Sequence, residues 1–414
     1  MKRVVITGIG ALTPIGNNKE IFWTNLLKGV SGAEKITRFD TSKFKTDFAC
    51  EVKDFDPLVH FDRKEARKLD RFNQYGLVAA EEAISDSGVD FSKLDRNRVG
   101  VIWSSGIGGF ETFEEEVINF TQGDFNPRFN PFFITKIIAN SVAGLISIKH
   151  ELRGVNSCPV TACASSSQGI IQGFNYIKWG KADMIIAGGS EAPITQSSIG
   201  GFNAMKALSA NNENYKTASR PFDKTRDGFI IGEGSGALVL ESLESALHRN
   251  AKIYAEVIGG GESADAYHIT GTHPEGLGAY LAMKLAIEEG NISPKDIHYI
   301  NAHATSTGLG DISEVKAITK LFDGNPDLHI SGTKSMTGHL LGAAGAIEAI
   351  IAALSVKDNA IPPTINTKEI DEEIPTHLNL CLNTKVEKEV NYALSNSFGF
   401  GGHCATLLVK KYTD

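Results

Sequence analysis

Residues 157–167 read SCPVTACASSS, and they mark a point where a short apolar strand is expected to give way to a helix. Apolar residues then recur at helical spacing, at Ile170, Ile171, Phe174 and Ile177. This spacing predicts a helix with one buried face. Cys163 would lie at the helix N-terminus, where backbone N–H groups and the helix dipole lower the pKa of a thiol. A nucleophile on a strand–turn–helix unit suits acyl transfer, although a buried structural cysteine is the alternative.

On both sides of this segment, short β-branched runs alternate with helical patterns. Strands are predicted at residues 4–7, 99–103, 184–187, 237–240, 253–258, 297–301, 328–331 and 406–409. Helices are predicted at residues 64–87, 164–178, 276–289, 311–321 and 339–356. The alternation indicates an α/β protein with layered, largely buried strands.

Two of the predicted strands are expected to end in glycine-rich turns, in residues 4–10 (VVITGIG) and 255–261 (AEVIGGG). The chain is longer than a single hydrophobic core supports, so these similar segments favour two related halves that meet near residue 250. The sequence contains no linker between them, which predicts that the halves pack closely. The turn with Gly8 and Gly10 lacks the third glycine of a dinucleotide-binding fingerprint, so no such site is expected.

Charge and cysteine content restrict the class of protein. The chain of 414 residues has a net charge of −8, which argues against general binding of nucleic acid or anionic membranes. Its 5 cysteines are scattered and form no C-x-x-C pair, so neither a disulfide framework nor a metal site is expected. Glycines and prolines interrupt the apolar N-terminus, and no stretch suits a membrane helix. We therefore expect a cytoplasmic protein.

Two later segments carry further reactive side chains. In residues 299–311 (YINAHATSTGLGD), His303 falls at the end of an apolar strand, in a loop that opens a helix. In residues 332–348 (GTKSMTGHLLGAAGAIE), Lys334 and His339 precede a helix of small and apolar residues. A buried Glu348 in that helix would need a partner, and Lys334 is a plausible one. Each segment also has an ordinary explanation, such as tight helix packing or a histidine that only forms a hydrogen bond.

Taken together, the segments resemble the condensing enzymes of fatty-acid synthesis in the thiolase superfamily, specifically the type II β-ketoacyl-acyl-carrier-protein synthases. The resemblance covers essentially the whole chain. The matching motifs are residues 161–163 (TAC), 303–307 (HATST), 334–339 (KSMTGH), 398–402 (FGFGG), 220–223 (RPFD) and 227–229 (DGF). The resemblance implies a thiolase-like α/β fold with a five-layered α-β-α-β-α core. Its halves would be residues 1–250, with the nucleophile, and 251–414, with both histidines.

The resemblance also implies a mechanism. Cys163 would accept an acyl chain as a thioester, and the backbone N–H groups of Cys163 and Phe400 would form an oxyanion hole. Malonyl-acyl-carrier protein would then lose carbon dioxide, and its enolate would attack the acyl group. His303 and His339, as neutral imidazoles, would donate hydrogen bonds to the malonyl thioester oxygen.

Other roles carry over from the same motifs. Lys334 and Glu348 would form an ion pair that orders the histidines, and Asp311 would support the structure at a helix start. The residues expected to bind the phosphopantetheine arm are Thr305 and Thr307. The acyl pocket is expected to be lined by Ile107, Phe133, Phe202 and Phe398. Phe400 would act as its gate, and Thr270 would bind the substrate from a mobile loop. Ile107 is expected to shape the preference for chain length, whereas an ordinary core position is the alternative for Phe133.

The expected partners are acyl carrier protein and a second copy of the chain, with neither nucleic acid nor a membrane. The substrates would be carried on the phosphopantetheine of acyl carrier protein, and the enzyme itself would bind no cofactor. Because acyl carrier protein is acidic, a basic docking patch is expected. Lys64, Arg67, Lys68 and Arg71 recur at spacings that place them on one helical face, and with Lys206 they resemble the docking positions of the family. A solvated helix face is the alternative.

The sequence departs from the family pattern in two places. Residues 164–168 (ASSSQ) replace the threonine-glycine pair and nearby histidine of many relatives. Cys404 replaces a common asparagine, and is expected to bring a second thiol beside the pocket.

The expected function is a decarboxylative Claisen condensation in fatty-acid elongation, catalysed by an acyltransferase. The same condensation in a polyketide or aryl-polyene pathway is the first alternative. A second is a non-condensing partner subunit, which the presence of Cys163 opposes. A third is a cysteine hydrolase, which the two histidine motifs oppose.

Overall fold

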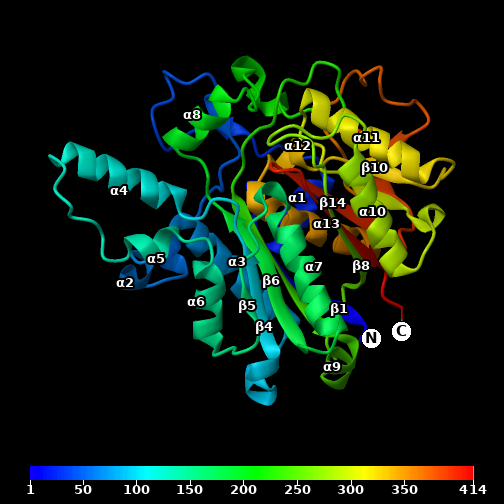
Figure 1. The fold of residues 1–414 in the computed structure, drawn as a ribbon, viewed down its shortest axis with the longest axis horizontal. Helices are drawn as coiled ribbons and strands as arrows, with labels where there is room; N and C mark the ends of the chain where they lie inside the picture. The colour runs from blue at the N-terminus through cyan, green and yellow to red at the C-terminus, as the bar shows by residue number, and fades with distance from the viewer. Residues whose placement is uncertain (414) are drawn as a thin grey trace.

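The computed structural model describes residues 1–413, and within them 11 strands form one mixed sheet (Figure 1). The strand order is β12-β10-β9-β14-β15-β8-β1-β7-β6-β4-β5. The bounds are β1 (Val4–Leu12), β4 (Val99–Ser104), β5 (Asn156–Ser157), β6 (Met184–Glu191), β7 (Gly234–Ser242), β8 (Ala255–Ala264), β9 (Tyr299–Asn301), β10 (His329–Ser331), β12 (Asn379–Leu380), β14 (Tyr392–Gly399) and β15 (His403–Lys410). Two short pairs stand apart, β2 (Glu34–Lys35) with β3 (Phe48–Ala49) and β11 (Ala360–Ile361) with β13 (Val386–Glu387).

The sheet has the same pairing pattern on either side of its centre. β1 and β8 pair with each other antiparallel, and each then pairs antiparallel with its next neighbour, β7 or β15. These neighbours pair antiparallel with β6 and β14, and the strands beyond them, β4 and β9, run parallel. The predicted similarity between the segments at residues 4–10 and 255–261 thus corresponds to equivalent central strands.

Helices cover both faces of the sheet (Figure 1). Some of them lie between the two sides of the molecule, one side containing the half of the sheet that begins at β1 and the other the half that begins at β8. The helices are α1 (Lys19–Leu27), α2 (Arg63–Ala66), α3 (Arg71–Ser87), α4 (Phe110–Gln122), α5 (Phe133–Ile137), α6 (Ser141–His150), α7 (Ser165–Lys178), α8 (Gln196–Ala204), α9 (Leu243–His248), α10 (Leu277–Gly290), α11 (Gly308–Phe322), α12 (Lys334–Thr337) and α13 (Ala344–Asp358). The main apolar core joins α7 and α13 to strands of both sides. A second core lies under α3 and α6, and a third under α10 and α11. The predicted thiolase-like α/β fold is confirmed, as a large mixed sheet with helices packed on it.

The glycines of the central strands were predicted to form turns. They lie instead inside β1 and β8. A Cβ atom on Gly8 or Gly10 would lie 2.1–2.2 Å from carbonyl oxygens of α3. A Cβ atom on Gly259 or Gly261 would lie 1.9–2.2 Å from carbonyl oxygens of α10. The glycines therefore let each helix backbone pack directly on its strand, which is why the strands continue through them.

Two predicted helices begin well away from the observed starts, and the helix predicted at residues 311–321 begins three residues earlier, at Gly308. The helix predicted at residues 64–87 is interrupted, because Asp70 takes an extended conformation (φ −74°, ψ 163°) and caps the start of α3 by accepting a hydrogen bond from the backbone of Phe72. The helix predicted at residues 339–356 begins later, at Ala344, so His339 lies in the segment before it. The sequence pattern also missed β14, because its buried Ser395, Asn396 and Ser397 break the apolar run.

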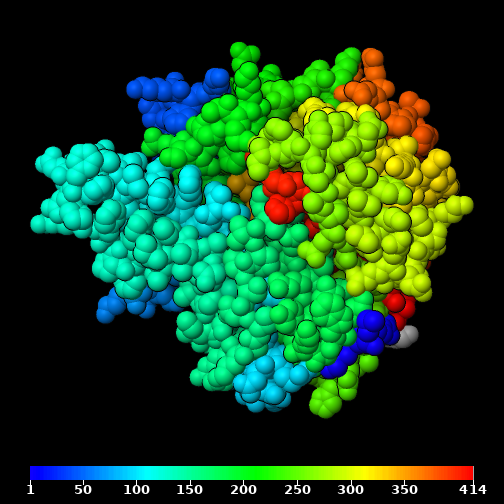
Figure 2. All heavy atoms as spheres, in the orientation of Figure 1, coloured from blue at the N-terminus to red at the C-terminus, as the bar shows by residue number. Residues whose placement is uncertain are grey.

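One part of the chain projects from the layers. α4, α5 and the segment between them form an arm, residues 110–138, which extends to the left in Figure 1 and forms a separate lobe in Figure 2. The arm exposes Phe113, Phe125, Phe129 and Ile134. Among the described residues, no helix has the length and apolar character needed to span a bilayer.

Candidate active site

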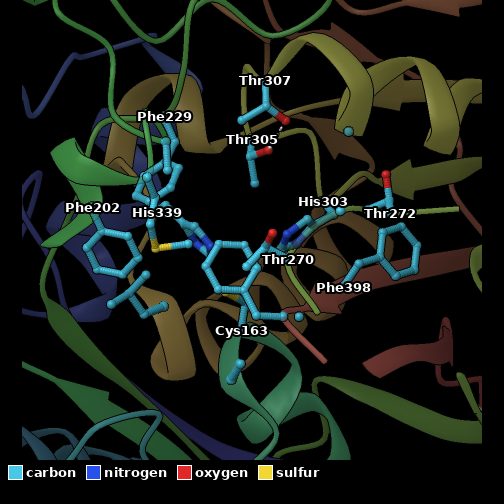
Figure 3. A pocket seen from close by; sticks show the side chains of 18 of the residues that line it. Cys163, Phe202, Phe229, Thr270, Thr272, His303, Thr305, Thr307, His339 and Phe398 are labelled. Carbon is cyan, nitrogen blue, oxygen red and sulfur yellow. Dashed lines mark hydrogen bonds between the residues drawn. The ribbon is translucent and has the colours of Figure 1, made fainter. Parts of the chain in front are cut away.

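A cavity of about 340 Å³ lies where the two sides of the molecule meet. It is lined by most of the residues that the sequence predicted, namely Ile107, Cys163, Phe202, Thr270, His303, Thr305, Thr307, His339, Phe398 and Phe400. In Figure 3, the imidazoles of His303 and His339 lie above Cys163, and the two threonines lie beyond the imidazoles. The cavity therefore brings a thiol, two imidazoles and two hydroxyls together from segments far apart in the sequence.

The turn that carries Cys163 is tightly held. Cys163 lies in a single 3-10 turn, Ala162–Ala164, directly before α7. Ala162 has a φ of +51°, a left-handed conformation that is costly for a residue with a Cβ atom. The Ser165 hydroxyl accepts a hydrogen bond from the backbone of Thr161 at 2.8 Å and donates one to the carbonyl of Ala162 at 2.6 Å. Ser165 thus closes the turn from both ends and holds the thiol at the start of the helix.

The acid strength of this thiol differs from the prediction. Burial raises the pKa of Cys163 to about 12, and the Glu191 charge adds to this. The charge of Lys334 and the backbone N–H of Phe400 act in the opposite direction. The predicted lowering of this pKa is therefore wrong, because burial favours the uncharged thiol. At neutral pH the group is a thiol.

The two imidazoles face each other at right angles, with ring centroids 5.3 Å apart. Burial lowers the pKa of both His303 and His339 well below the ordinary value of 6.5, and the nearby Lys334 charge lowers it further. Both rings are therefore neutral, as predicted, and each offers one N–H donor and one acceptor nitrogen.

A buried carboxylate that the sequence reasoning missed holds the segment with His303. The Glu314 oxygens accept hydrogen bonds from the backbone N–H groups of His303, at 2.9 Å, and Ala304, at 2.8 Å. One of these oxygens also accepts a hydrogen bond from the Asn396 amide at 3.0 Å, which ties the segment to β14. The signal in the sequence was the position of Glu314 on the buried face of α11, one turn after Asp311.

The predicted contact between Lys334 and Glu348 is present, as a hydrogen-bonded ion pair whose side chains are 2–3% exposed. Burial raises the pKa of Glu348 to about 7, and the Lys334 ammonium opposes that shift. Asp311 is also fully buried, in the first turn of α11. Its carboxylate accepts hydrogen bonds from the backbone of Phe222 and Ser306, so it braces the loop that carries the two threonines.

Thr305 and Thr307 lie close together in that loop. Their hydroxyl oxygens are 3.0 Å apart and share a hydrogen bond. Both residues line the cavity on the side away from Cys163 in Figure 3. Two hydroxyls in this position could bind an amide-containing arm that enters toward the thiol.

Two residues predicted beside the cavity lie elsewhere. Phe133 does not line it but belongs to the arm, where its ring stacks on those of Phe113 and Phe129. This correction follows from the projection of α4 and α5 away from the layers. Cys404 also lies outside the cavity, buried in β15 and directed toward Gly278 of α10. Phe398, the partner of Cys404 across the sheet, projects from the same face of the strand pair but does line the cavity.

The basic residues predicted to form one helical face are divided by the break before α3. Lys64, Arg67 and Lys68 are exposed in and after α2, as is Lys206 beside the cavity residue Met205. Arg71 belongs instead to α3 and forms an ion pair with Glu111 at 2.9 Å. Arg71 is therefore not available on the predicted face.

Comparisons with known proteins identify one family over most of the chain. The sequence model described as "Beta-ketoacyl synthase, N-terminal domain" matches residues 1–246, and "Beta-ketoacyl synthase, C-terminal domain" matches residues 254–368. The 3-oxoacyl-[acyl-carrier-protein] synthase 2 of Staphylococcus aureus (strain COL) is 49% identical over 413 residues, which covers 99% of each chain.

Two solved structures also match over 100% of both chains. The ishigamide ketosynthase/chain length factor has a TM-score of 0.93 and 33% identity. A ketosynthase solved in complex with its type II polyketide acyl-carrier protein and bound to the hexaketide has a TM-score of 0.92 and 32% identity.

Proposed function

The chain belongs to the β-ketoacyl synthase family, and from this premise we propose that it elongates fatty acids by decarboxylative condensation. An acyl chain held on Cys163 would react with malonyl-acyl-carrier protein to give β-ketoacyl-acyl-carrier protein and carbon dioxide. One observation carries the proposal: Cys163, His303 and His339 line a single buried cavity. A thiol and two neutral imidazoles in one cavity support the proposal, because the reaction requires a nucleophile and hydrogen-bond donors beside it.

In the first step, the Cys163 sulfur attacks the thioester carbonyl of the acyl-carrier protein. The new carbon–sulfur bond forms as the bond to the phosphopantetheine sulfur breaks. Because the thiol is protonated at neutral pH, its proton must leave during the attack, and the neutral imidazoles in the same cavity are available acceptors. The proton then returns to the departing phosphopantetheine thiolate, so the step is balanced.

The oxyanion of this step would be bound by the backbone N–H groups of Cys163 and Phe400. Two contacts support this assignment. The Phe400 N–H lies close enough to the Cys163 sulfur to favour its ionised form, and the preceding Gly399 packs against the Cys163 amide. Backbone donors held in this way stabilise charge where it develops.

In the second step, the malonyl group loses carbon dioxide and leaves an enolate. His303 and His339 would each donate an N–H hydrogen bond to the enolate oxygen. The enolate carbon then attacks the acyl carbonyl on Cys163, the carbon–carbon bond forms, and the sulfur leaves as a thiolate that takes a proton from water. Neutral rings suit this step because they donate without losing a proton to the enolate.

Thr305 and Thr307 would bind the phosphopantetheine arm, and Ile107, Phe202 and Phe398 would line the acyl chain's site, with Thr270 near the entrance. Their place on the cavity wall supports these roles. The relative of 49% identity is a 3-oxoacyl-[acyl-carrier-protein] synthase 2, whereas the ishigamide ketosynthase and the type II polyketide ketosynthase are 33% and 32% identical. The difference favours fatty-acid elongation over the polyketide alternative.

We also propose acyl carrier protein as the partner, docked on Lys64, Arg67, Lys68 and Lys206. The complex of a similar ketosynthase with its own carrier protein supports this. The exposed apolar side chains of the arm support a homodimer, because a second copy could cover them. We further propose that the protein is cytoplasmic. Its two halves would be residues 1–250 and residues 251–414.

The test is to incubate the purified protein with acyl- and malonyl-acyl-carrier protein and to follow both by mass spectrometry. The expected result is an acyl group on Cys163, followed by a β-ketoacyl-carrier protein that is longer by two carbons. Release of free fatty acid instead would identify a hydrolase. No turnover at all would identify a non-condensing subunit.

A further inference from the structure

Glu191, the last residue of β6, is a fully buried carboxylate beside the cavity. Its Oε1 accepts hydrogen bonds from the Ser105 hydroxyl at 2.6 Å and the Ile107 backbone N–H at 3.2 Å. Its Oε2 accepts hydrogen bonds from the backbone N–H groups of Gly106 at 2.7 Å and Gly342 at 2.9 Å. Within residues 1–413, no basic side chain forms an ion pair with it.

Since all four partners donate, the site is built for the ionised carboxylate. Burial raises the pKa of Glu191, and the hydrogen bonds from Ser105, Gly106, Ile107 and Gly342 oppose that shift. A buried charge without a cation is costly unless hydrogen bonds satisfy it. This cost indicates that the carboxylate is retained for the arrangement of the segments that it joins.

The carboxylate joins two segments that shape the cavity. One is residues 105–108, which carry Ile107 on the cavity wall. The other is the turn with Gly342, which follows His339 and leads into α13. A Cβ atom on Gly342 would lie 2.7 Å from Glu191 Oε2 and 2.3 Å from the Gly106 nitrogen. The two segments thus meet backbone to backbone, with Glu191 as the group that holds them together.

We propose that Glu191 is a positioning residue for acyl-chain selectivity, which fixes the Ile107 wall of the cavity relative to the segment that carries His339. This inference rests on the proposed function. Ile107 itself is 40% exposed, so packing alone holds its side chain weakly. Gly108 follows it with a φ of +68° and donates a hydrogen bond to the Ser105 hydroxyl, which completes the loop. The main-chain anchor on Glu191 therefore sets the position of the wall.

Glutamine cannot replace this anchor, although it has nearly the same shape. Its NH₂ group would face the N–H groups of Gly106 and Gly342, or that of Ile107. In either orientation a buried donor loses its acceptor. Glu191→Gln is therefore expected to loosen the 105–108 loop and to weaken discrimination between acyl chains of different length.

The experiment compares wild type, Glu191→Gln and Ser105→Ala with Glu241→Gln as a matched control. Glu241 is also a fully buried carboxylate on a strand, but it pairs with Arg249 and does not line the cavity. The acylation rate of Cys163 is measured with a series of short to long acyl-carrier proteins, and the ratio of long-chain to short-chain rates is calculated. The midpoint of thermal unfolding is recorded for every variant.

The expected result is a change of about tenfold in this ratio for Glu191→Gln, a smaller change in the same direction for Ser105→Ala, and none for Glu241→Gln. If the ratio is unchanged in Glu191→Gln while its thermal midpoint falls as in Glu241→Gln, the role is only structural and the proposal is overturned. If Glu191→Gln does not fold, Ser105→Ala decides by the same criterion. Failure of wild type to accept any acyl chain would instead overturn the proposed function, and this inference with it.

Discussion

Gly399 packs directly against the turn that carries Cys163. A Cβ atom on Gly399 would lie 3.0 Å from the Cys163 amide nitrogen and 2.6 Å from the Thr161 carbonyl oxygen. Gly399 ends β14, whereas Cys163 lies in the turn before α7, so this contact joins the two sides of the molecule at the nucleophile. The position of the thiol therefore depends on the absence of a side chain more than 230 residues away in the sequence.

Gly399→Ala is expected to displace the Cys163 turn and to lower the rate of acylation by about 10²-fold, since small errors in position have effects of this size. The measurement is the rate at which Cys163 takes up a labelled acyl group. Gly144→Ala is the control, because a Cβ atom there meets nothing within 4 Å. Equal acylation rates in both variants would contradict the expected effect.

Cys163→Ala is expected to abolish formation of the acyl-enzyme, because among residues 1–413 no other cysteine lines the cavity. Labelled acyl-carrier protein and intact-protein mass spectrometry detect the adduct. Cys404→Ala serves as the control and should still be acylated, since its thiol is directed toward α10. An acyl group on the Cys163→Ala protein would show that another residue is the nucleophile.

The neutral imidazoles predict a loss of stability in acid. The pKa of His303 and His339 is lowered in the folded protein, so below about pH 6.5 the unfolded chain binds protons that the folded chain does not. The contribution of the two neutral imidazoles to the free energy of unfolding is therefore fully present above that pH. It is lost as the pH falls, by about 1.4 kcal/mol per pH unit for each ring.

Urea unfolding between about pH 7.5 and pH 5 measures this effect. The variant with both His303→Asn and His339→Asn should lose less stability over the same range than wild type, because its side chains do not titrate there. Parallel curves for the two proteins would mean that the folded rings are not protected from protonation.

Removing one partner of the buried Lys334–Glu348 pair is expected to destabilise the protein by about 3–5 kcal/mol, because the other charge remains buried alone. Replacing both, as Lys334→Met with Glu348→Leu, should recover much of that stability. It should not restore condensation, since the Lys334 charge also acts on Cys163 and both imidazoles. Urea unfolding and product formation measured on the same samples separate the two effects, and restored condensation would limit the pair to a structural role.

Docking of acyl carrier protein is tested by charge reversal. Lys64→Glu and Lys206→Glu are expected to raise the KM for malonyl-acyl-carrier protein by about tenfold with little change in kcat. High salt should reduce the difference. The control is Lys93→Glu, at a side chain that is 80% exposed at the end of the 3-10 turn Phe91–Lys93. A similar effect from all three variants would indicate only the influence of net charge.

The sequence identified the reactive groups because they occur in local motifs. Cys163, His303 and His339 each stand at the boundary of a strand or loop and a helix, where short patterns are informative. Glu191 and Glu314 escaped notice because the role of each depends on hydrogen-bond donors from other segments, which no local pattern shows. The raised pKa of Cys163 escaped notice for the same reason, since burial depends on the whole fold whereas the helix terminus is local.

The fold was predicted well where strands are apolar and less well where packing sets the bounds. Gly8 and Gly261 looked like turn residues, but the helices on top of them require their lack of a side chain. The helix predicted from residue 64 was too long because Asp70 caps a new helix within the same periodic pattern. Phe133 was assigned to the cavity from resemblance, and nothing local distinguishes an apolar arm from an apolar pocket.

The central position of β1 has a consequence for how the chain is made. All nine residues of this first strand are buried, and its neighbours are β7 and β8, which end at Ser242 and Ala264. At the usual rate of synthesis, β1 leaves the ribosome on the order of tens of seconds before both neighbours exist. During that interval an apolar strand has two unpaired edges, so a nascent chain that stalls before β7 would be a target for chaperones and a seed for aggregation.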